Sequence, residues 1–221
     1  MTTTLDDIRT LSPLQLDALR EVANMGAGHA ATALSHMTGG TIMISVPKLH
    51  VANLAAVAPE FSAQEEPVAA VALDMLGDLT GRTMLVFPKP TVMRMAELML
   101  RRPAGSSVAL GELERSAIKE AGNILSGAYL NALADFMGMV LLPSPPKLVV
   151  DMSTTVLTRE YLGQPDDVDY VFVVETEFIM QDVAERLRGL VAISPTVGTS
   201  GSSGSRFNPH WNNGTNSFLG R

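Results

Sequence analysis

Two stretches of the sequence decide the fold, and they are copies of each other. "QLDALREVANMGAGHAATALSHMTG" covers residues 15–39, and "ERSAIKEAGNILSGAYLNALADFMG" covers residues 114–138. An offset of 99 positions places identical residues on one another at Leu14/Leu113, Glu21/Glu120, Asn24/Asn123, Gly28/Gly127, Leu34/Leu133 and Gly39/Gly138. The same offset continues into the next segment, where residues 46–51 fall on 145–150. An offset held over ~35 residues indicates an internal duplication.

Both copies predict the same order of elements. Ser12 and Pro13 suit the start of a helix over residues 10–37, which ends at Gly39-Gly40. An extended segment follows, then a hairpin with its turn at Gly81-Arg82, then a helix starting near Thr91. The second copy predicts a helix over 111–137 and three strands within 147–194.

This order predicts an α/β protein of layered α+β type. We expect a mixed or antiparallel sheet with pseudo-two-fold symmetry and two long helices packed on it side by side. The predicted domain is single and covers residues 1–196, with repeats at about 11–103 and 110–195. Residues 197–221 form a Gly/Ser/Asn-rich tail, which we interpret as disordered or artificial, the alternative being a natural tail or fused peptide that docks on the protein. The helix that symmetry predicts after Pro195 is missing from the second copy.

A polar stripe recurs on the two otherwise apolar helices. The first stripe is Asp17, Glu21 and Asn24, and the second stripe is Ser116, Glu120 and Asn123. Residues at i, i+4 and i+7 lie within ~60° of one another around a helix, so each stripe forms one narrow face. A solvated helix face has the same pattern, but matched residue types in two diverged copies make a docking face equally plausible.

Gly28 and Gly127 recur inside the same helices, further along from the stripes. A glycine in the middle of a helix costs roughly 1 kcal/mol relative to alanine. Keeping it in both copies predicts that another element approaches the helix closely at these two points.

Composition excludes several classes of function. The chain has 221 residues, 46% of them apolar, a net charge of −7 and no cysteine. These values predict a globular protein without disulfides or thiolate chemistry and without the basic surface that binds nucleic acid. Apolar runs are too short for a membrane span, and the polar, acidic first residues do not resemble a signal peptide. We therefore expect a cytoplasmic protein with no membrane insertion.

The stripe residues point to positioning chemistry rather than covalent catalysis. No histidine repeats beside them, and no phosphate-binding loop follows a strand. The amide of an asparagine can accept a hydrogen bond from water while it donates one to a phosphoryl oxygen. Phosphoryl transfer depends mainly on such positioning and on electrostatics. A carboxylate one turn before the asparagine can pair with a cation of a partner, so the pattern favours a helix presented to another protein's active site.

The two stretches resemble the two motifs of the CheC-type chemotaxis phosphatases, in the CheC/CheX/FliY group. That family's pattern is Asp or Ser, three residues, Glu, two residues and Asn, and both copies match it over a resemblance covering roughly residues 11–195. Two motifs favour CheC over the single-motif CheX, and the lack of a recognisable further domain after Pro195 favours it over FliY. The departure from the family is the missing final helix.

The resemblance implies a function and roles for the residues. Such proteins hydrolyse the aspartyl phosphate of the response regulator CheY. By position, Asn24 and Asn123 would orient the attacking water, and Glu21 and Glu120 would dock the regulator through its lysine. Asp17 and Ser116 would complete the motifs. The family implies no cofactor of the chain's own, a Mg²⁺ ion held by the regulator, and a second partner in CheD, the receptor deamidase.

Two other interpretations stay open at this point. The chain could be a non-catalytic or weakly catalytic binding module for CheD or phosphorylated CheY, since an exposed Glu/Asn face serves docking equally well. It could also be a structural scaffold, on which the stripes are only solvated surface.

Overall fold

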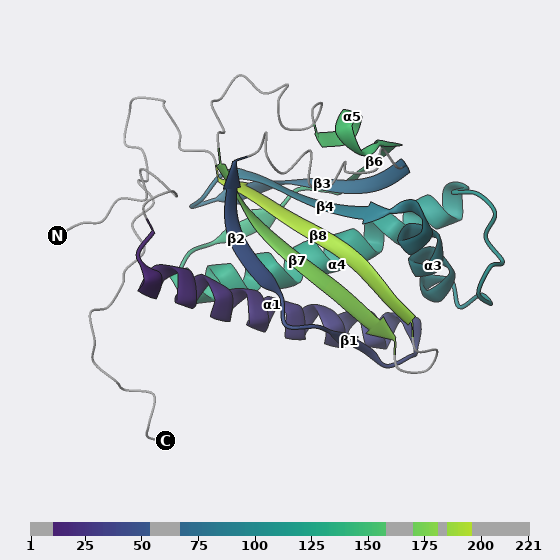
Figure 1. The fold of residues 1–221 in the computed structure, drawn as a ribbon, viewed down its shortest axis with the longest axis horizontal. Coiled ribbons are helices and arrows are strands. Elements are labelled where there is room, and N and C mark those ends of the chain that lie inside the picture. The colour runs from purple at the N-terminus through teal and green to yellow at the C-terminus, as the bar shows by residue number, and fades with distance from the viewer. Residues whose placement is uncertain (1–10, 54–66, 158–169, 181–184, 196–221) are drawn as a thin grey trace.

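The protein is a layered assembly of one sheet and two long helices, seen in a computed structural model that describes residues 11–53, 67–157, 170–180 and 185–195 (Figure 1). Its elements are, in chain order, α1 (Pro13–Thr38), β1 (Ile42–Ile44), β2 (Lys48–Asn53), β3 (Pro67–Gly77), β4 (Gly81–Pro88), α3 (Lys89–Met99), α4 (Glu112–Met137), β5 (Leu141–Pro143), β6 (Lys147–Met152), α5 (Ser153–Leu157), β7 (Tyr170–Met180) and β8 (Glu185–Pro195).

The eight strands form one sheet whose two halves are interlocked. Its order is β1-β7-β8-β4-β3-β5, with β2 also pairing with β7 and β6 also pairing with β3. All of these pairings are antiparallel. The first two strands of each half therefore pair with the other half, and β4 and β8 join the halves at the centre. The predicted α+β class, with its pseudo-two-fold order, is confirmed.

The ends of the two long helices follow from local chemistry. At the start of α1, the Ser12 hydroxyl accepts from the Gln15 backbone N–H, and the Gln15 side chain accepts from the Ser12 N–H at 2.8 Å. This capping box satisfies two backbone donors that the helix itself leaves unpaired. Both helices end at a glycine in the left-handed region, Gly39 with φ 74° and Gly138 with φ 63°, which other residues adopt at a steric cost.

A serine divides the predicted extended segment into two strands in each half. Ser45 donates its backbone N–H to Glu177 O at 2.8 Å, and its hydroxyl accepts from Glu177 N at 3.2 Å. Ser144 makes the same pair of bonds with Asp74, at 2.8 Å and 2.9 Å. Each pair of bonds spans a one-residue bulge. Between the last pair of one ladder and the first pair of the next, the serine-containing chain advances four residues while its partner strand advances three.

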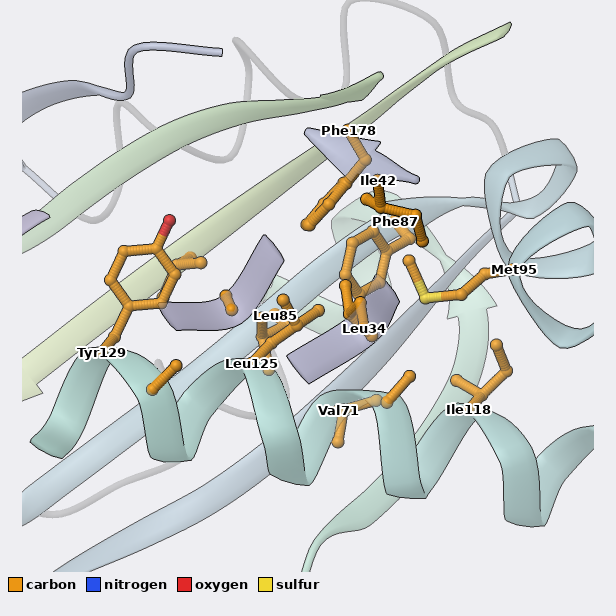
Figure 2. Packing of buried hydrophobic residues seen from close by; sticks show 14 of the residues in the cluster. Leu34, Ile42, Val71, Leu85, Phe87, Met95, Ile118, Leu125, Tyr129 and Phe178 are labelled. Carbon is orange, nitrogen blue, oxygen red and sulfur yellow. The ribbon is translucent and has the colours of Figure 1, made fainter. Parts of the chain in front are cut away.

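The main core lies between the sheet and the two long helices. Figure 2 shows side chains of α4, including Ile118, Leu125 and Tyr129, directed toward the sheet. The rings of Phe87 and Phe178 meet there from two strands, with centroids 6.2 Å apart. A smaller core of strand valines and alanines, with Val156 of α5, covers the other face of the sheet. The side chains that α4 buries opposite its polar stripe include Ile118, Leu125, Ala128, Tyr129, Ala132 and Leu133.

Two glycines allow α1, α4 and the sheet to approach closely. A Cβ added at Gly26 of α1 would lie 2.7 Å from Cδ1 of Tyr129 on α4. A Cβ added at Gly122 of α4 would lie 2.5 Å from Cγ1 and 2.8 Å from Cβ of Val71 on β3. Such distances are shorter than van der Waals contact, so both positions require glycine.

Three details of the sequence-based prediction are wrong. Within the described ranges, nothing lies within 4 Å of a Cβ added at Gly28 or Gly127. The close approaches between helices and sheet occur instead at Gly26 and Gly122, which the repeat does not share. The hairpin turn lies at residues 78–80, because β4 already begins at Gly81. The short helix α5 was not predicted, since five residues are too few to show helical periodicity.

The prediction of a missing helix after Pro195 and of a tail at 197–221 lies outside the described residues. The predicted limits of the domain, 1–196, and of its repeats therefore remain predictions. None of the helices in the described ranges is both long and apolar enough to span a membrane.

The segment between α3 and α4 is held by a buried carboxylate. Glu97 is 2% exposed and accepts from the backbone N–H groups of Gly105 at 3.1 Å and Ser107 at 2.8 Å. Arg94 lies 3.5 Å away. Burial raises the pKa of this carboxyl, but the two backbone hydrogen bonds and the Arg94 charge outweigh it, so the pKa lies below its ordinary 4.5.

We predict that two alanine substitutions on one helix change stability in opposite directions. Gly122→Ala lowers the free energy of unfolding by about 1–2 kcal/mol, because overpacking against stiff, buried Val71 exceeds the gain in helix propensity. Gly127→Ala raises it by up to about 1 kcal/mol, because helix propensity improves and the new methyl group meets no described residue. Urea unfolding measures the free energy of unfolding of both variants. Equal changes in that free energy for Gly122→Ala and Gly127→Ala would contradict the packing described for Gly122.

We also predict an acid-dependent contribution from Glu97. Glu97→Gln lowers stability at pH 7 by about 1–3 kcal/mol, because a neutral amide replaces a buried charged acceptor. A carboxyl with a lowered pKa stabilises the fold above its unfolded pKa and loses that effect as pH falls through the folded pKa. The difference in free energy of unfolding between the unmodified protein and Glu97→Gln is therefore constant from pH 7 to about 5. It shrinks as the pH falls below the ordinary pKa of 4.5. Denaturation at several pH values tests this, with exposed Glu112→Gln as the matched control.

Candidate functional site

The first stripe lies on the solvent face of α1. Asp17, Glu21 and Asn24 are all exposed, while Val22 and Ala23 between them are buried at 5% and 3% exposure. The helix thus turns its apolar residues to the core and holds the three polar side chains outward. Their spacing along the axis follows from 1.5 Å per residue and places Asn24 ~10 Å from Asp17.

The second stripe occupies the corresponding face of α4. Ser116 and Glu120 are exposed, and Asn123 is partly buried. Ala117, Ile118 and Ala121 alternate with them and are buried at 9%, 0% and 0% exposure. α1 and α4 run in opposite directions over the same face of the sheet (Figure 1). The stripes occupy positions of these two helices that the 99-residue offset relates, and both are turned away from the core.

Most stripe side chains are unengaged within the described part of the chain. Asp17 is the exception, since it binds Arg20 at 2.7 Å, with both side chains more than half exposed. Between described residues, no side-chain hydrogen bond or ion pair involves Glu21, Asn24, Ser116, Glu120 or Asn123. Polar groups held outward on rigid helices, without internal partners, can bind another molecule without first breaking a bond.

Sequence reasoning assigned no place on these faces to two further pairs of residues. Arg20 and Lys119 are both exposed, and each precedes the glutamate of its stripe. Leu14 and Leu113 are 75% and 61% exposed in the first turns of the two helices. The offset of 99 positions relates the members of both pairs, so comparing exposed positions between the copies would have found them. They add a cation and an apolar contact to each polar face.

The arrangement can position groups but does not enclose a substrate. A cavity between α1, β1, α3 and β7 is small and apolar, and its lining includes Leu34, Met95 and Phe178 but no stripe residue. Among the described residues, no three His, Asp or Glu side chains gather closely enough to hold a metal ion. Each stripe is a convex helix face, so the reacting group and the rest of the site would have to come from a partner.

Comparison with known proteins identifies relatives along most of the chain. A model of the CheC-like family matches residues 14–51 and 113–150, which contain both stripes. CheY-P phosphatase CheC of Bacillus subtilis (strain 168) is 32% identical over 183 residues, covering 82% of this chain and 88% of that protein. Flagellar motor switch phosphatase FliY of the same organism is 26% identical over 145 residues, covering 65% of this chain and 38% of FliY.

Solved structures agree with the sequence relatives. Thermotoga maritima FliY superposes with a TM-score of 0.68 at 26% identity, over 84% of this chain and 92% of that one. The two segments that match the family model begin 99 positions apart, which is the offset between the copies. Since a relative of 32% identity aligns over most of both proteins, this chain belongs to the CheC-like family.

Proposed function

We propose that this protein hydrolyses the aspartyl phosphate of a CheY-type response regulator and uses both stripes to do so. Two of its relatives are named as phosphatases, one of them specifically for CheY-P. The observation that carries the proposal is structural: an exposed glutamate and an asparagine stand unengaged on the same face of each long helix. A convex face of this kind suits a substrate that brings its own active site.

In the proposed reaction, the asparagine amide spans the attacking water and the phosphoryl group. Asn24 or Asn123 accepts a hydrogen bond from the water through its side-chain oxygen and donates from its side-chain nitrogen to a phosphoryl oxygen. The water oxygen forms a bond to phosphorus while the bond from phosphorus to the aspartyl oxygen breaks. The products are inorganic phosphate, which retains the protons of the water, and the free carboxylate of the regulator. Holding water and phosphorus in line removes much of the entropic barrier.

The glutamates would fix the orientation of the regulator. Glu21 and Glu120 each lie three residues, nearly one turn, before the asparagine, so a lysine bound there sits beside the reacting group. Asp17 and Ser116, one turn before the glutamates, would add contacts with the regulator. The Mg²⁺ ion that neutralises phosphoryl charge in such reactions would belong to the regulator. A CheD-type protein remains the second predicted partner.

We predict that Asn24→Ala combined with Asn123→Ala abolishes the reaction while sparing the fold. Release of phosphate from the phosphorylated regulator falls by about 100-fold or more, because the water is no longer held in line. Stability changes by less than about 0.5 kcal/mol, since neither amide has a partner among the described residues. The measurement is a dephosphorylation time course with less protein than regulator, supported by urea unfolding.

The same time course separates the phosphatase from a binding module. The phosphatase releases more than one phosphate per chain, whereas a non-catalytic binder of phosphorylated CheY releases none above the regulator's own rate. Asn131→Ala is the matched control, because Asn131 is an exposed asparagine of α4 two turns beyond Asn123. A double variant as active as the unmodified protein would refute the proposed mechanism.

We predict that Glu21→Lys combined with Glu120→Lys weakens regulator binding at least tenfold. Reversing a charge that faces a lysine replaces attraction by repulsion, and the loss is greatest at low salt. Titration of the regulator at two salt concentrations measures the effect, with exposed Glu112→Lys as the control. Unchanged binding would favour stripes that are only solvated surface.

A further inference from the structure

Gly28 and Gly127 extend the two polar stripes by one further turn. Each lies four residues beyond the asparagine of its stripe, ~40° around the helix and ~6 Å along it. Residues that are identical in the two copies along this face are Leu14/Leu113, Glu21/Glu120, Asn24/Asn123 and Gly28/Gly127. The glycine is therefore part of a repeated surface, and the question is what requires it.

Neither their backbone conformation nor packing against the described residues requires these glycines. Both lie inside α-helices, and the positive φ values of the described glycines occur elsewhere, at turns and helix ends. A Cβ added at either position would have no atom of a neighbouring described residue within 4 Å. Gly26 and Gly122, in the same helices, show the opposite behaviour, with added Cβ atoms within 2.7 Å of Tyr129 and 2.5 Å of Val71.

The two glycines nevertheless weaken the helices that carry them. A glycine inside a helix is less favourable than alanine because it loses more backbone entropy on folding. Both copies carry this destabilising glycine at the same place, beside the asparagine, where alanine would fit without strain. No described residue uses the vacant space, and its place beside the exposed asparagine points to a molecule that docks on the stripe.

We propose that Gly28 and Gly127 are positioning residues that let the regulator's backbone approach the helix beside Asn24 and Asn123. This inference rests on the proposed phosphatase function. The occupant is a loop of the regulator beside its phosphorylated aspartate, because the asparagine reaches that group only when the two surfaces touch. A methyl group holds an opposing carbon ~3.5–4.0 Å away, so it would displace the loop outward. A misplacement of ~1 Å can reduce a positioned reaction about 100-fold.

The test is Gly28→Ala combined with Gly127→Ala, compared with the unmodified protein. We expect phosphate release at limiting regulator concentration to fall at least tenfold. Affinity for the regulator carrying beryllium fluoride as a stable phosphoryl mimic should also weaken. The melting temperature should rise, because both helices gain propensity. Replacing both glycines by leucine should remove phosphate release and binding altogether. Activity that falls while thermal stability rises cannot come from damage to the fold.

The control is Asp135→Ala, together with Asp135→Leu. Asp135 is exposed on α4, two turns beyond Gly127, so these changes place the same alanine and leucine side chains outside the docking face. Both should leave phosphate release unchanged.

Two outcomes would overturn the inference. In the first, the Gly28→Ala/Gly127→Ala variant keeps phosphate release and regulator affinity within twofold of the unmodified protein, while the Asn24/Asn123 variant loses its activity. That result would refute the role of the glycines and leave the proposed function standing. The other is a lower melting temperature alongside the lost activity, which would assign the glycines to packing. If the unmodified protein fails to accelerate dephosphorylation, the proposed function itself is wrong.

Discussion

The close packing of α1 on α4 and of α4 on the sheet is the constraint on which the rest of this structure depends. Gly26 leaves room for the ring of Tyr129, and Gly122 leaves room for Val71. These contacts set the rotation of each helix about its axis, because turning either helix would drive a side chain into its neighbour. Once the rotation is set, the residues on the opposite face must point to solvent. The outward direction of both polar stripes is thus a consequence of core packing.

The interlocked sheet supplies the second constraint. β1 and β2 pair with β7, while β5 and β6 pair with β3, so each half of the chain completes its edge with strands from the other half. The pairing of Ser45 with Glu177 and of Ser144 with Asp74 repeats the same bulge at both edges. Neither half could satisfy its backbone hydrogen bonds alone, which explains how two diverged copies remain one structural unit with both helices on a common face.

A convex site has different requirements from a pocket. A pocket assembles its chemistry internally, whereas each stripe offers an amide and a carboxylate that act only when a partner brings the reacting group. Such a site needs no enclosed volume. It needs rigid placement and room for close approach, and the buried helix faces and the open space at Gly28 and Gly127 provide these. The two carboxyl groups whose pKa lies below the ordinary 4.5 hold the segment that joins α3 to α4. Glu97 accepts from two backbone N–H groups of that segment, and Glu114 of α4 accepts from the Arg102 guanidinium at 2.5 Å.

The sequence by itself determined the duplication, the helix caps at Ser12, Gly39 and Gly138, the α+β class and the pairing of like residues between the stripes. These follow from local chemistry and from periodicity, which act over a few residues or along one helix. Tertiary structure alone decided which strands pair across the two halves and which glycines lie in close contact with another element, because both depend on contacts between distant segments. Gly26 and Gly122 look unremarkable in the repeat yet lie where two elements touch, while the repeated Gly28 and Gly127 have no described residue within 4 Å of an added Cβ. Sequence shows that a glycine is present, but only the neighbours in space show whether the missing side chain makes room for this chain or for another.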